Sequence, residues 1–327
     1  MRVAFMGSPD FAVPCLRALV DANHEVALVV SQPDKPAGRG KEMHAPAVKT
    51  AAVALGLPVI QPKSARNGEL EQAIRAANVE LCVVVAYGKI LPKAVLEAAP
   101  RGCINVHGSI LPKYRGAAPV QRSVIDAEEE TGVSIMQLDE GMDTGPVFSI
   151  VKTAIHADET AGELMVRLAP IGAAALIDVL AQIAAGTAVA QAQDAAQATH
   201  AAMLDKADGA IDFTVEASLV ASRIRGVDPW PGAQAMLRGQ PIKLFRAHLT
   251  DGTAARGPGT VVNIDKEGVH VTCHGGVIAI KELQAAGRKR MSAHDFAAGR
   301  GIAIGDKFEK VDIAPTPPKG APKPSTP

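Results

Sequence analysis

The stretch from Glu80 to Gly108 holds two short apolar runs, "ELCVVVAY" (80–87) and "GCINVHG" (102–108). Runs of the same kind stand at 2–7, 25–31 and 58–61, and helical segments separate them. Short β-branched runs that alternate with helices are typical of βαβ units, whose parallel sheet is covered on both faces. The first half of the chain is therefore predicted to be an α/β domain.

Two further runs, at 132–139 and 145–155, are joined only by a Gly-rich link, which predicts one antiparallel pair at the end of the sheet. A long amphipathic stretch, roughly 158 to 185, is expected to be a closing helix. The segment that follows is low in large apolar residues and is interpreted as a linker, residues 188–207.

The pattern changes beyond this linker. After one expected helix at 216–226, short runs bounded by Gly, Pro and Asp begin at 240 and continue to 283, which is typical of a small β-barrel or sandwich. The predicted division is a domain at 1–187, the linker, a β domain at 208–312, and a Pro-rich tail at 313–327 that should be disordered or extended.

The amino-acid composition limits the possible partners and the compartment of the protein. The chain has 327 residues, and 47% of them are apolar. Its 34 basic residues balance its 34 acidic ones, so any surface that binds nucleic acid must be a local cluster of basic residues. Its four cysteines show no CxxC pairing and are expected to be buried thiols in a reducing compartment. No apolar run is expected to reach membrane-spanning length, and the protein is interpreted as soluble and cytoplasmic.

Asn105 and His107 lie two residues apart on an expected strand, so their side chains should leave the same face. Ligands of open parallel sheets sit beyond the carboxyl ends of the strands, and the loop "LDEGMDTGP" (138–146) is expected at the same end. If the two strand ends are close, Asp143 reaches His107. An amide, an imidazole and a carboxylate would then suit acyl-type transfer through an oxyanion. The alternative is a turn Asn and a surface His.

Other chemistries lack support in the sequence. There is no G-x-S-x-G elbow for a covalent hydrolase, no G-x-G-x-x-G turn for a nicotinamide or flavin cofactor, and no Walker loop. The stretch "HVTCH" (270–274) resembles a metal cluster, but Cys273 on a strand would face away from the two histidines. No metal site is predicted.

Two segments are basic. The first, "QPDKPAGRGKEMHAPAVK" (32–49), is long for a βα loop and is expected to have no structure of its own. The second, "AGRKRM" (286–291), lies in the β domain. Either could bind the phosphates of a nucleic acid or be a solvated surface. The basic side chains concerned are Lys35, Arg39, Lys41, Lys49, Arg288, Lys289 and Arg290.

These motifs resemble a known family. The stretches "GSPDFA", "QPDKPAGRGK", "VVVAYGKILP", "GCINVHGSILPKYRGAAPVQRS", "TGVSIMQLDEGMDTG" and "DPWPGA" occur in this order in methionyl-tRNA formyltransferases. The resemblance covers about residues 1 to 310 and leaves only the tail unmatched. N-x-H-x-S-x-L-P with a downstream D-x-G-x-D-T-G is specific to folate-dependent formyltransferases. Two departures are mild: Ile110 stands where the family usually has Leu, and Tyr114 where many members have Trp.

The resemblance implies a Rossmann-like catalytic domain, an OB-like barrel, and transfer of a formyl group from 10-formyltetrahydrofolate to the α-amine of initiator methionyl-tRNA. It identifies Asn105, His107 and Asp143 as catalytic. It also implies that the segment 32–49 binds tRNA, mainly through Arg39, and that the enzyme is a monomer without a protein partner. The implied folate site comprises Lys89, Ile90, Leu91, Ser109, Ile110, Leu111 and Pro112.

Two alternatives remain at this stage. The first is another folate enzyme, either a formyltransferase acting on a small amine or a formyltetrahydrofolate hydrolase, which would need neither the basic insertion nor the second domain. The second is a non-catalytic RNA-binding protein that uses the β domain. It would not require Asn, His and Asp to converge.

Overall fold

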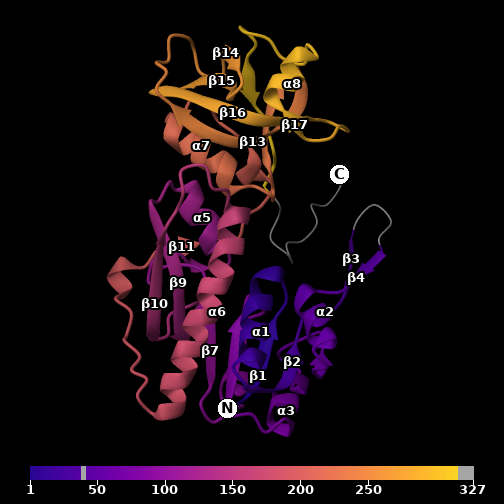
Figure 1. Cartoon of the computed structure of the whole chain (residues 1–327), viewed down its shortest axis with the longest axis vertical. Coiled ribbons are helices and arrows are strands. Elements are labelled where there is room, and N and C mark those ends of the chain that lie inside the picture. The colour runs from indigo at the N-terminus through magenta and orange to yellow at the C-terminus, as the bar shows by residue number, and fades with distance from the viewer. Residues whose placement is uncertain (38–41, 316–327) are drawn as a thin grey trace, which may run out of the picture. The chain divides into compact units, whose positions relative to one another are not determined.

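Figure 1 shows the computed structural model of the protein, in which residues 1–37 and 42–315 are described. Its contacts divide the chain into two compact units. Unit 1 comprises residues 1–120, 130–154 and 164–202, and unit 2 comprises 121–129, 155–163 and the chain from 203 onward. By its contacts, the segment up to residue 202 belongs to unit 1. The domain boundaries expected from composition, at 187 and 207, stay a proposal.

Unit 1 contains a seven-stranded sheet in the order β10-β9-β7-β6-β1-β2-β5. The strands from β5 to β7 are parallel, as predicted, and β9 and β10 form the predicted antiparallel pair. β9 is also antiparallel to β7, which the apolar pattern did not indicate. The strands are β1 (Arg2–Gly7), β2 (Glu25–Val30), β5 (Val59–Ile60), β6 (Leu81–Val85), β7 (Cys103–His107), β9 (Glu130–Gln137) and β10 (Val147–Ala154).

Helices cover both faces of this sheet. One face packs on α3 and α4 through a cluster of buried side chains that includes Leu70 and Val95 of the helices and Cys103 of β7. The other face carries α6, where Gly172 lies against Val106 of β7. The helices of unit 1 are η1 (Asp10–Ala12), α1 (Val13–Asp21), α2 (Ala47–Ala54), α3 (Glu69–Ala76), α4 (Lys93–Leu96) and α6 (Ala161–Ala185) from residue 164 onward. Most of α5 (Pro119–Ile125) belongs to unit 2.

Helix α6 corrects one expectation. It is long and apolar enough to cross a membrane by length and composition, with a mean hydropathy of 1.9, so the expectation that no apolar run reaches that length is wrong. Its packing is that of a core helix. Leu176 and Leu180 are fully buried, and a Cβ placed on Gly172 would lie 2.9 Å from Cγ1 of Val106. Glycine therefore lets the helix approach the strand that carries Asn105 and His107.

Two segments expected to lack structure contain short strands. In the basic segment 32–49, β3 (Lys35–Ala37) and β4 (Glu42–His44) pair as an antiparallel hairpin. In the expected linker, β11 (His200–Ala201) pairs in parallel with β8 (Arg115–Gly116), and η2 (Ala195–Gln197) precedes it. Strands of two or three residues are too short to produce a hydrophobic period, so the sequence pattern could not reveal them.

Unit 2 contains an antiparallel sheet in the order β14-β15-β16-β13-β12-β18, with β17 paired to β16. A bridge between Thr260 and Lys307 joins the segments that precede the two end strands, so the sheet curls on itself, as the predicted barrel requires. The elements are η3 (Ala207–Gly209), α7 (Ala217–Gly226), β12 (Ala233–Leu237), β13 (Gln240–Thr250), β14 (Val261–Asp265), β15 (Gly268–Cys273), β16 (Gly276–Ala285), β17 (Met291–Ser292), α8 (Ala293–Ala298) and β18 (Phe308–Lys310).

All four cysteines are free thiols and all are buried, as expected. Burial raises the pKa of Cys15 and that of Cys273 to about 12, because a thiolate loses its hydration there.

Candidate active site

Strand β7 positions the first two candidate residues. It lies between β6 and β9, and strand alternation places Cys103, Asn105 and His107 on one face. Asn105 is 9% exposed and His107 is 5% exposed. Among the described residues, no hydrogen bond holds the Asn105 carboxamide, although its neighbours on the sheet are packed. A buried amide with no protein partner is available to a ligand.

Asp143 reaches His107 by a different route from the one expected. Because β9 runs antiparallel to β7, its carboxyl end lies beside the beginning of β7, where Gln137 pairs with Ile104. The N–H of Leu138 donates to the carbonyl oxygen of Cys103 at 2.8 Å. The premise that two carboxyl strand ends converge is therefore wrong. The loop 138–146 brings the carboxylate back, and Oδ2 of Asp143 lies 3.7 Å from Nδ1 of His107.

The loop is held in shape by its own residues. Asp143 adopts a left-handed backbone with φ of 53°. Asp139 accepts hydrogen bonds from the hydroxyl of Thr144 at 2.7 Å and from the N–H of Gly141 at 3.0 Å. A Cβ on Gly145 would collide with the carbonyl oxygen of Gln137, so the motif needs glycine there. Asp139 thus supports the loop, while Asp143 faces the histidine.

The hydrogen bonds around His107 define its protonation pattern. Nε2 lies 2.9 Å from the carbonyl oxygen of Tyr114. A carbonyl oxygen only accepts, so Nε2 carries a hydrogen and Nδ1 faces Asp143. Oδ2 of Asp143 also accepts a hydrogen bond from the N–H of Gly116 at 2.8 Å. A protonated His107 would therefore be oriented by a carbonyl on one side and a carboxylate on the other.

The turn after β7 holds four residues of the predicted folate site. Ser109 is fully buried, and its hydroxyl donates to the carbonyl oxygen of Lys113 at 2.7 Å. The hydroxyl of Ser134 donates to the carbonyl oxygen of Ser109 at 2.7 Å and accepts from the N–H of Leu111 at 3.1 Å. Ser109 and Ser134 therefore shape the turn. Leu111 packs with Met136 and Val147, while Ile110 and Pro112 are half-buried.

The other predicted folate residues follow β6. Nζ of Lys89 donates to the carbonyl oxygen of Pro62 at 2.6 Å, and burial lowers the pKa of this lysine. Ile90 is 67% exposed, whereas Leu91 is buried. A cavity of about 820 Å³ lies in unit 1 beside the loop that follows β9. It is lined by α4 and the segment after it and by the chain from Gln137 to Gly141. Its size suits a small organic ligand.

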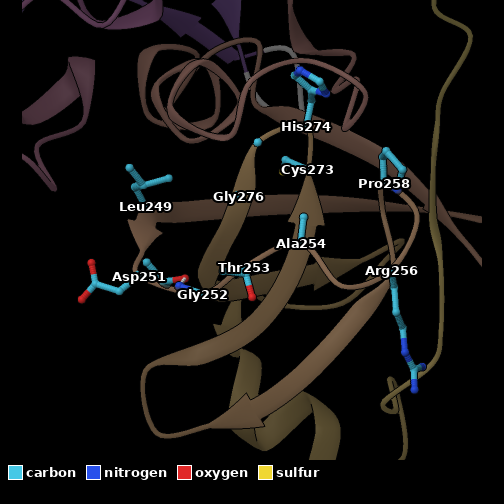
Figure 2. Close-up of a pocket in the computed structure, with 12 residues that line it drawn as sticks. Leu249, Asp251, Gly252, Thr253, Ala254, Arg256, Pro258, Cys273, His274 and Gly276 are labelled. Carbon is cyan, nitrogen blue, oxygen red and sulfur yellow. Dashed lines mark hydrogen bonds between the residues drawn. The ribbon is translucent and has the colours of Figure 1, made fainter.

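A second cavity, of about 690 Å³, lies in unit 2 and contains none of the predicted site residues (Figure 2). Its lining includes Leu249, Arg256, Cys273 and His274. His274 is already paired with a carboxylate, because its Nε2 lies 3.2 Å from Oε1 of Glu216. We assign no function to this cavity.

The basic segment 32–49 is described in part. Lys35 is exposed on β3. Nζ of Lys49 lies 2.7 Å from Oδ2 of Asp34, and Gln61 donates to the other oxygen of the same carboxylate. These two bonds, with that of Lys49 first, hold the pKa of Asp34 below its usual value. Lys49 therefore supports the base of the segment. Arg39 and Lys41 lie outside the described residues.

The basic triplet 288–290 in unit 2 also contains both exposed and paired cations. Arg288 and Lys289 are exposed. Arg290 instead forms an ion pair with Glu282 and lies 3.3 Å from Oδ2 of Asp228. Its guanidinium also stacks 4.0 Å from the ring centroid of Phe245. Two of the three cations thus face solvent, and the third belongs to a structural network.

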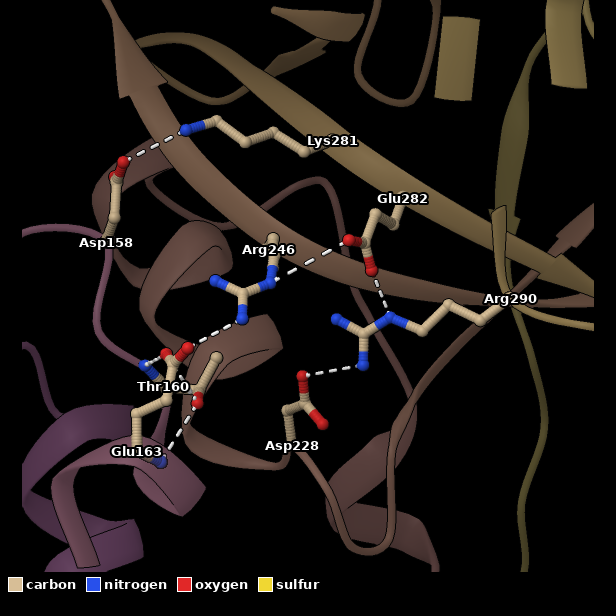
Figure 3. Close-up of polar contacts among 8 residues, drawn as sticks. All are labelled: Asp158, Thr160, Glu163, Asp228, Arg246, Lys281, Glu282 and Arg290. Carbon is tan, nitrogen blue, oxygen red and sulfur yellow. Dashed lines mark hydrogen bonds and ion pairs between the residues drawn. The ribbon is translucent and has the colours of Figure 1, made fainter. Parts of the chain in front are cut away.

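The network around Arg290 extends within unit 2. Arg246 pairs with Glu163 at 2.6 Å and lies 3.8 Å from Glu282, and Lys281 pairs with Asp158 at 3.0 Å (Figure 3). The network joins β13 and β16 to the segment that precedes α6 and to the first turn of that helix. Within residues 1–37 and 42–315, no group of three His, Cys, Asp or Glu side chains is placed to hold a metal ion.

Two residues that were not among the predicted site residues lie beside the candidate site. Arg115 is 7% exposed, and its guanidinium donates to Gln193. Gln193 lies in the expected linker, where low hydrophobicity gave no reason to look for site residues.

Comparison with known proteins agrees with this arrangement. Residues 1–180 match the family model described as formyl transferase, and residues 203–301 match the one for its C-terminal domain. A methionyl-tRNA formyltransferase of Geotalea daltonii is 44% identical over 314 residues, which are 96% of this chain and 100% of that protein. The corresponding protein of Desulfotalea psychrophila is 46% identical over 302 residues, 92% of this chain and 94% of that one.

Among solved structures, a sugar 3N-formyl transferase crystallised with dTDP and 5-N-formyl-THF has a TM-score of 0.67 and 15% identity. The match covers 88% of this chain and 99% of that one, so the whole two-part fold is shared. The sequence matches and the fold lead to the same conclusion: this chain belongs to the formyl transferase family.

Proposed function

We propose that this protein transfers the formyl group of 10-formyltetrahydrofolate to the α-amino group of initiator methionyl-tRNA. The observation that carries this proposal is the cluster of Asn105, His107 and Asp143, with the Nδ1–Oδ2 distance of 3.7 Å and a free Asn carboxamide. The relatives that share 44% to 46% identity with this chain over nearly its whole length are methionyl-tRNA formyltransferases.

The chemistry follows from the donors around one carbonyl. The amine of methionine attacks the formyl carbon, a C–N bond forms, and the carbonyl oxygen becomes an oxyanion. The Asn105 amide and Nδ1 of protonated His107 would donate to that oxygen, each such donor being worth about 3 kcal/mol. Collapse breaks the bond to N10 of the folate, which takes the proton lost by the amine. Asp143 supports the positive charge of the imidazole.

The folate site is proposed at the turn after β7 and the segment after β6. Its position is supported by the exposed side chain of Ile90, which would be covered by a flat aromatic ring, whereas the 820 Å³ cavity in unit 1 contains none of the predicted folate residues. The sugar formyl transferase that shares the fold was solved with a formyl-folate. The folate acts as a co-substrate that supplies the formyl group, and the reaction proposed requires no metal.

The tRNA would be bound by basic side chains of the segment 32–49 and of the triplet 288–290. Lys35, Arg288 and Lys289 are exposed, and Arg39 and Lys41 stay part of the proposal although they lie outside the described residues. Because the whole chain is neutral, binding would depend on these local groups and weaken with salt. We place the protein in the cytoplasm, where the initiator tRNA is charged, and expect a monomer.

The direct test is incubation with 10-formyltetrahydrofolate and charged initiator tRNA, followed by analysis for acid-stable formylmethionine. Parallel reactions offer glycinamide ribonucleotide and an amino sugar nucleotide as acceptors. The proposal expects formylmethionine and no comparable turnover of the small amines. Preferred use of a small amine, or release of formate alone, would replace it with the corresponding folate enzyme.

Arg39→Ala tests the tRNA assignment of the basic segment. It should raise KM for methionyl-tRNA while the KM for the folate donor stays unchanged, because the variant removes a cation that is proposed to bind a tRNA phosphate. Equal effects on both substrates would argue against the assignment.

A further inference from the structure

Residues 191–201, which we call the strap, run along the outside of the two loops that build the candidate site. Gln191 and Val147 exchange backbone hydrogen bonds of 2.8 and 2.9 Å. Further along, the N–H of Arg115 donates to the carbonyl oxygen of Thr199 at 2.9 Å. The N–H of Tyr114 donates to the hydroxyl of Thr199 at 2.8 Å. The strap is thus hydrogen bonded to the chain after β9 and to the chain after β7.

Gln193 makes the connection between these loops with a single carboxamide. Its Nε2 donates to the carbonyl oxygens of Asp143 at 2.9 Å and Gly145 at 2.7 Å. Its Oε1 accepts from Nε and Nη2 of Arg115 at 3.0 and 2.8 Å. Carbonyls can only accept and a guanidinium can only donate, so only one orientation of the amide satisfies all four bonds.

Each loop held by Gln193 also supplies a backbone group that orients a catalytic candidate. The loop of Arg115 provides the Tyr114 carbonyl on Nε2 of His107 and the Gly116 N–H on Oδ2 of Asp143. The other loop carries Asp143 itself, whose carbonyl oxygen is bonded to Gln193. Gln193 therefore fixes both ends of the His107–Asp143 contact without touching either side chain.

We propose that Gln193 is a positioning residue for formyl transfer. Its amide hydrogens hold the loop 143–145 at the distance at which Asp143 supports His107. This inference rests on the proposed function and deepens it. A displacement of about 1 Å in a catalytic group can cost about a hundredfold in rate, so a hydrogen bond outside the site has a kinetic effect. The predicted folate residues, 89–91 and 109–112, lie outside the loop 143–145, so we expect folate binding to depend less on its position.

Two variants of Gln193 test the donor and the acceptor atom of its amide separately. Gln193→Met keeps the length of the side chain and removes all four bonds. Gln193→Glu keeps an acceptor for Arg115 but removes the donors, and it directs a carboxylate at two carbonyl oxygens. Gln197→Met is the matched control, because Gln197 lies in the same strap, is exposed, and bonds only to Asp194 at 2.9 Å.

We expect both Gln193 variants to lose about tenfold to a hundredfold in kcat, with KM for the folate donor within about twofold of wild type. Gln197→Met should match wild type. Wild-type kcat in Gln193→Glu would show that only the Arg115 half matters and would overturn the proposal. So would a loss that appears in KM alone.

Hydrogen exchange provides a readout without substrate. Peptides covering 113–117 and 141–146 should exchange faster in Gln193→Met than in Gln197→Met, while the rest of unit 1 stays protected. Unchanged exchange, or faster exchange throughout unit 1, would overturn the positioning role. If the wild-type protein fails to formylate methionyl-tRNA, the proposed function falls, but the exchange result still decides whether Gln193 holds the two loops.

Discussion

The carbonyl oxygen of Tyr114 lies 2.9 Å from Nε2 of His107, so Nε2 carries one proton of the imidazole. Nδ1 therefore becomes a donor only when the ring is charged. The Asp143 carboxylate lies 3.7 Å from Nδ1, where it would pair with the charged ring. The site thus combines one permanent donor, the Asn105 amide, with one that depends on protonation. Their removal should have different consequences, which the first two predictions address.

Asn105→Ala should lower kcat by about a hundredfold, because the oxyanion then has one donor fewer. The free energy of unfolding should change by no more than about 1 kcal/mol, since no described residue pairs with this carboxamide. Steady-state kinetics and urea unfolding measure the two quantities. Wild-type turnover would reject the oxyanion role, and a large loss of stability would show that the amide is structural.

Asp143→Asn should be at least as harmful to kcat, because the imidazole loses its charge partner while the shape of the loop is kept. Asp139→Asn is the matched control: Asp139 lies in the same loop and bonds to Thr144 and Gly141, away from His107. Its kcat should stay within about threefold of wild type, since an amide oxygen can still accept these bonds. Equal losses in the two variants would count against a special role for Asp143.

Gly172→Val should destabilise unit 1 by about 1 to 3 kcal/mol, because the added carbons must displace α6 from Val106. Ala174→Val places the same side chain at an exposed position of α6 and should cost no more than about 0.5 kcal/mol. Urea unfolding compares them. Activity should fall only in Gly172→Val, since Val106 stands between Asn105 and His107. Equal stability of the two variants would contradict this close packing.

Asp212 should make the stability of unit 2 depend on acidity. Bonds from Thr214 and Lys310 lower its pKa from 3.8 to about 2. A lowered folded pKa contributes stability that is fully present above pH 3.8 and is lost as the pH falls toward 2. The difference in unfolding free energy between wild type and Asp212→Asn should therefore shrink across this range. A constant difference would show that the carboxylate is not held as described.

The exposed and the paired cations of the 288–290 triplet should differ when substituted. Arg288→Ala with Lys289→Ala should weaken tRNA binding and reduce the salt slope by about 1 for each phosphate that is no longer neutralised, with stability unchanged. Arg290→Ala should instead cost about 2 kcal/mol of stability, because the buried carboxylate of Asp228 loses its cation. Filter binding at several salt concentrations and thermal unfolding distinguish them. If Arg290→Ala weakened tRNA binding and the double variant lowered stability, Arg290 would be the tRNA contact and the other two cations would be structural.

The sequence predicted what depends on local patterns. Each strand of the main sheet was found within a few residues of its expected range, and Asn105 and His107 leave one face because of alternation alone. The direction of β9 was not predictable, since an apolar run fits a parallel or an antiparallel neighbour equally well. Gln193 and Ser134 act through backbone carbonyls and N–H groups of distant segments, and no residue spacing records such contacts.

The strap also determines where this chain can be cut and fused to another domain. A chimaera that fuses residues 1–187 to a foreign barrel would discard Gln193 and Thr199 and leave the loops around His107 without their outer support. A junction after residue 202 would carry that support along. The transplantable catalytic module therefore extends beyond its last long helix, and engineered swaps should be cut accordingly.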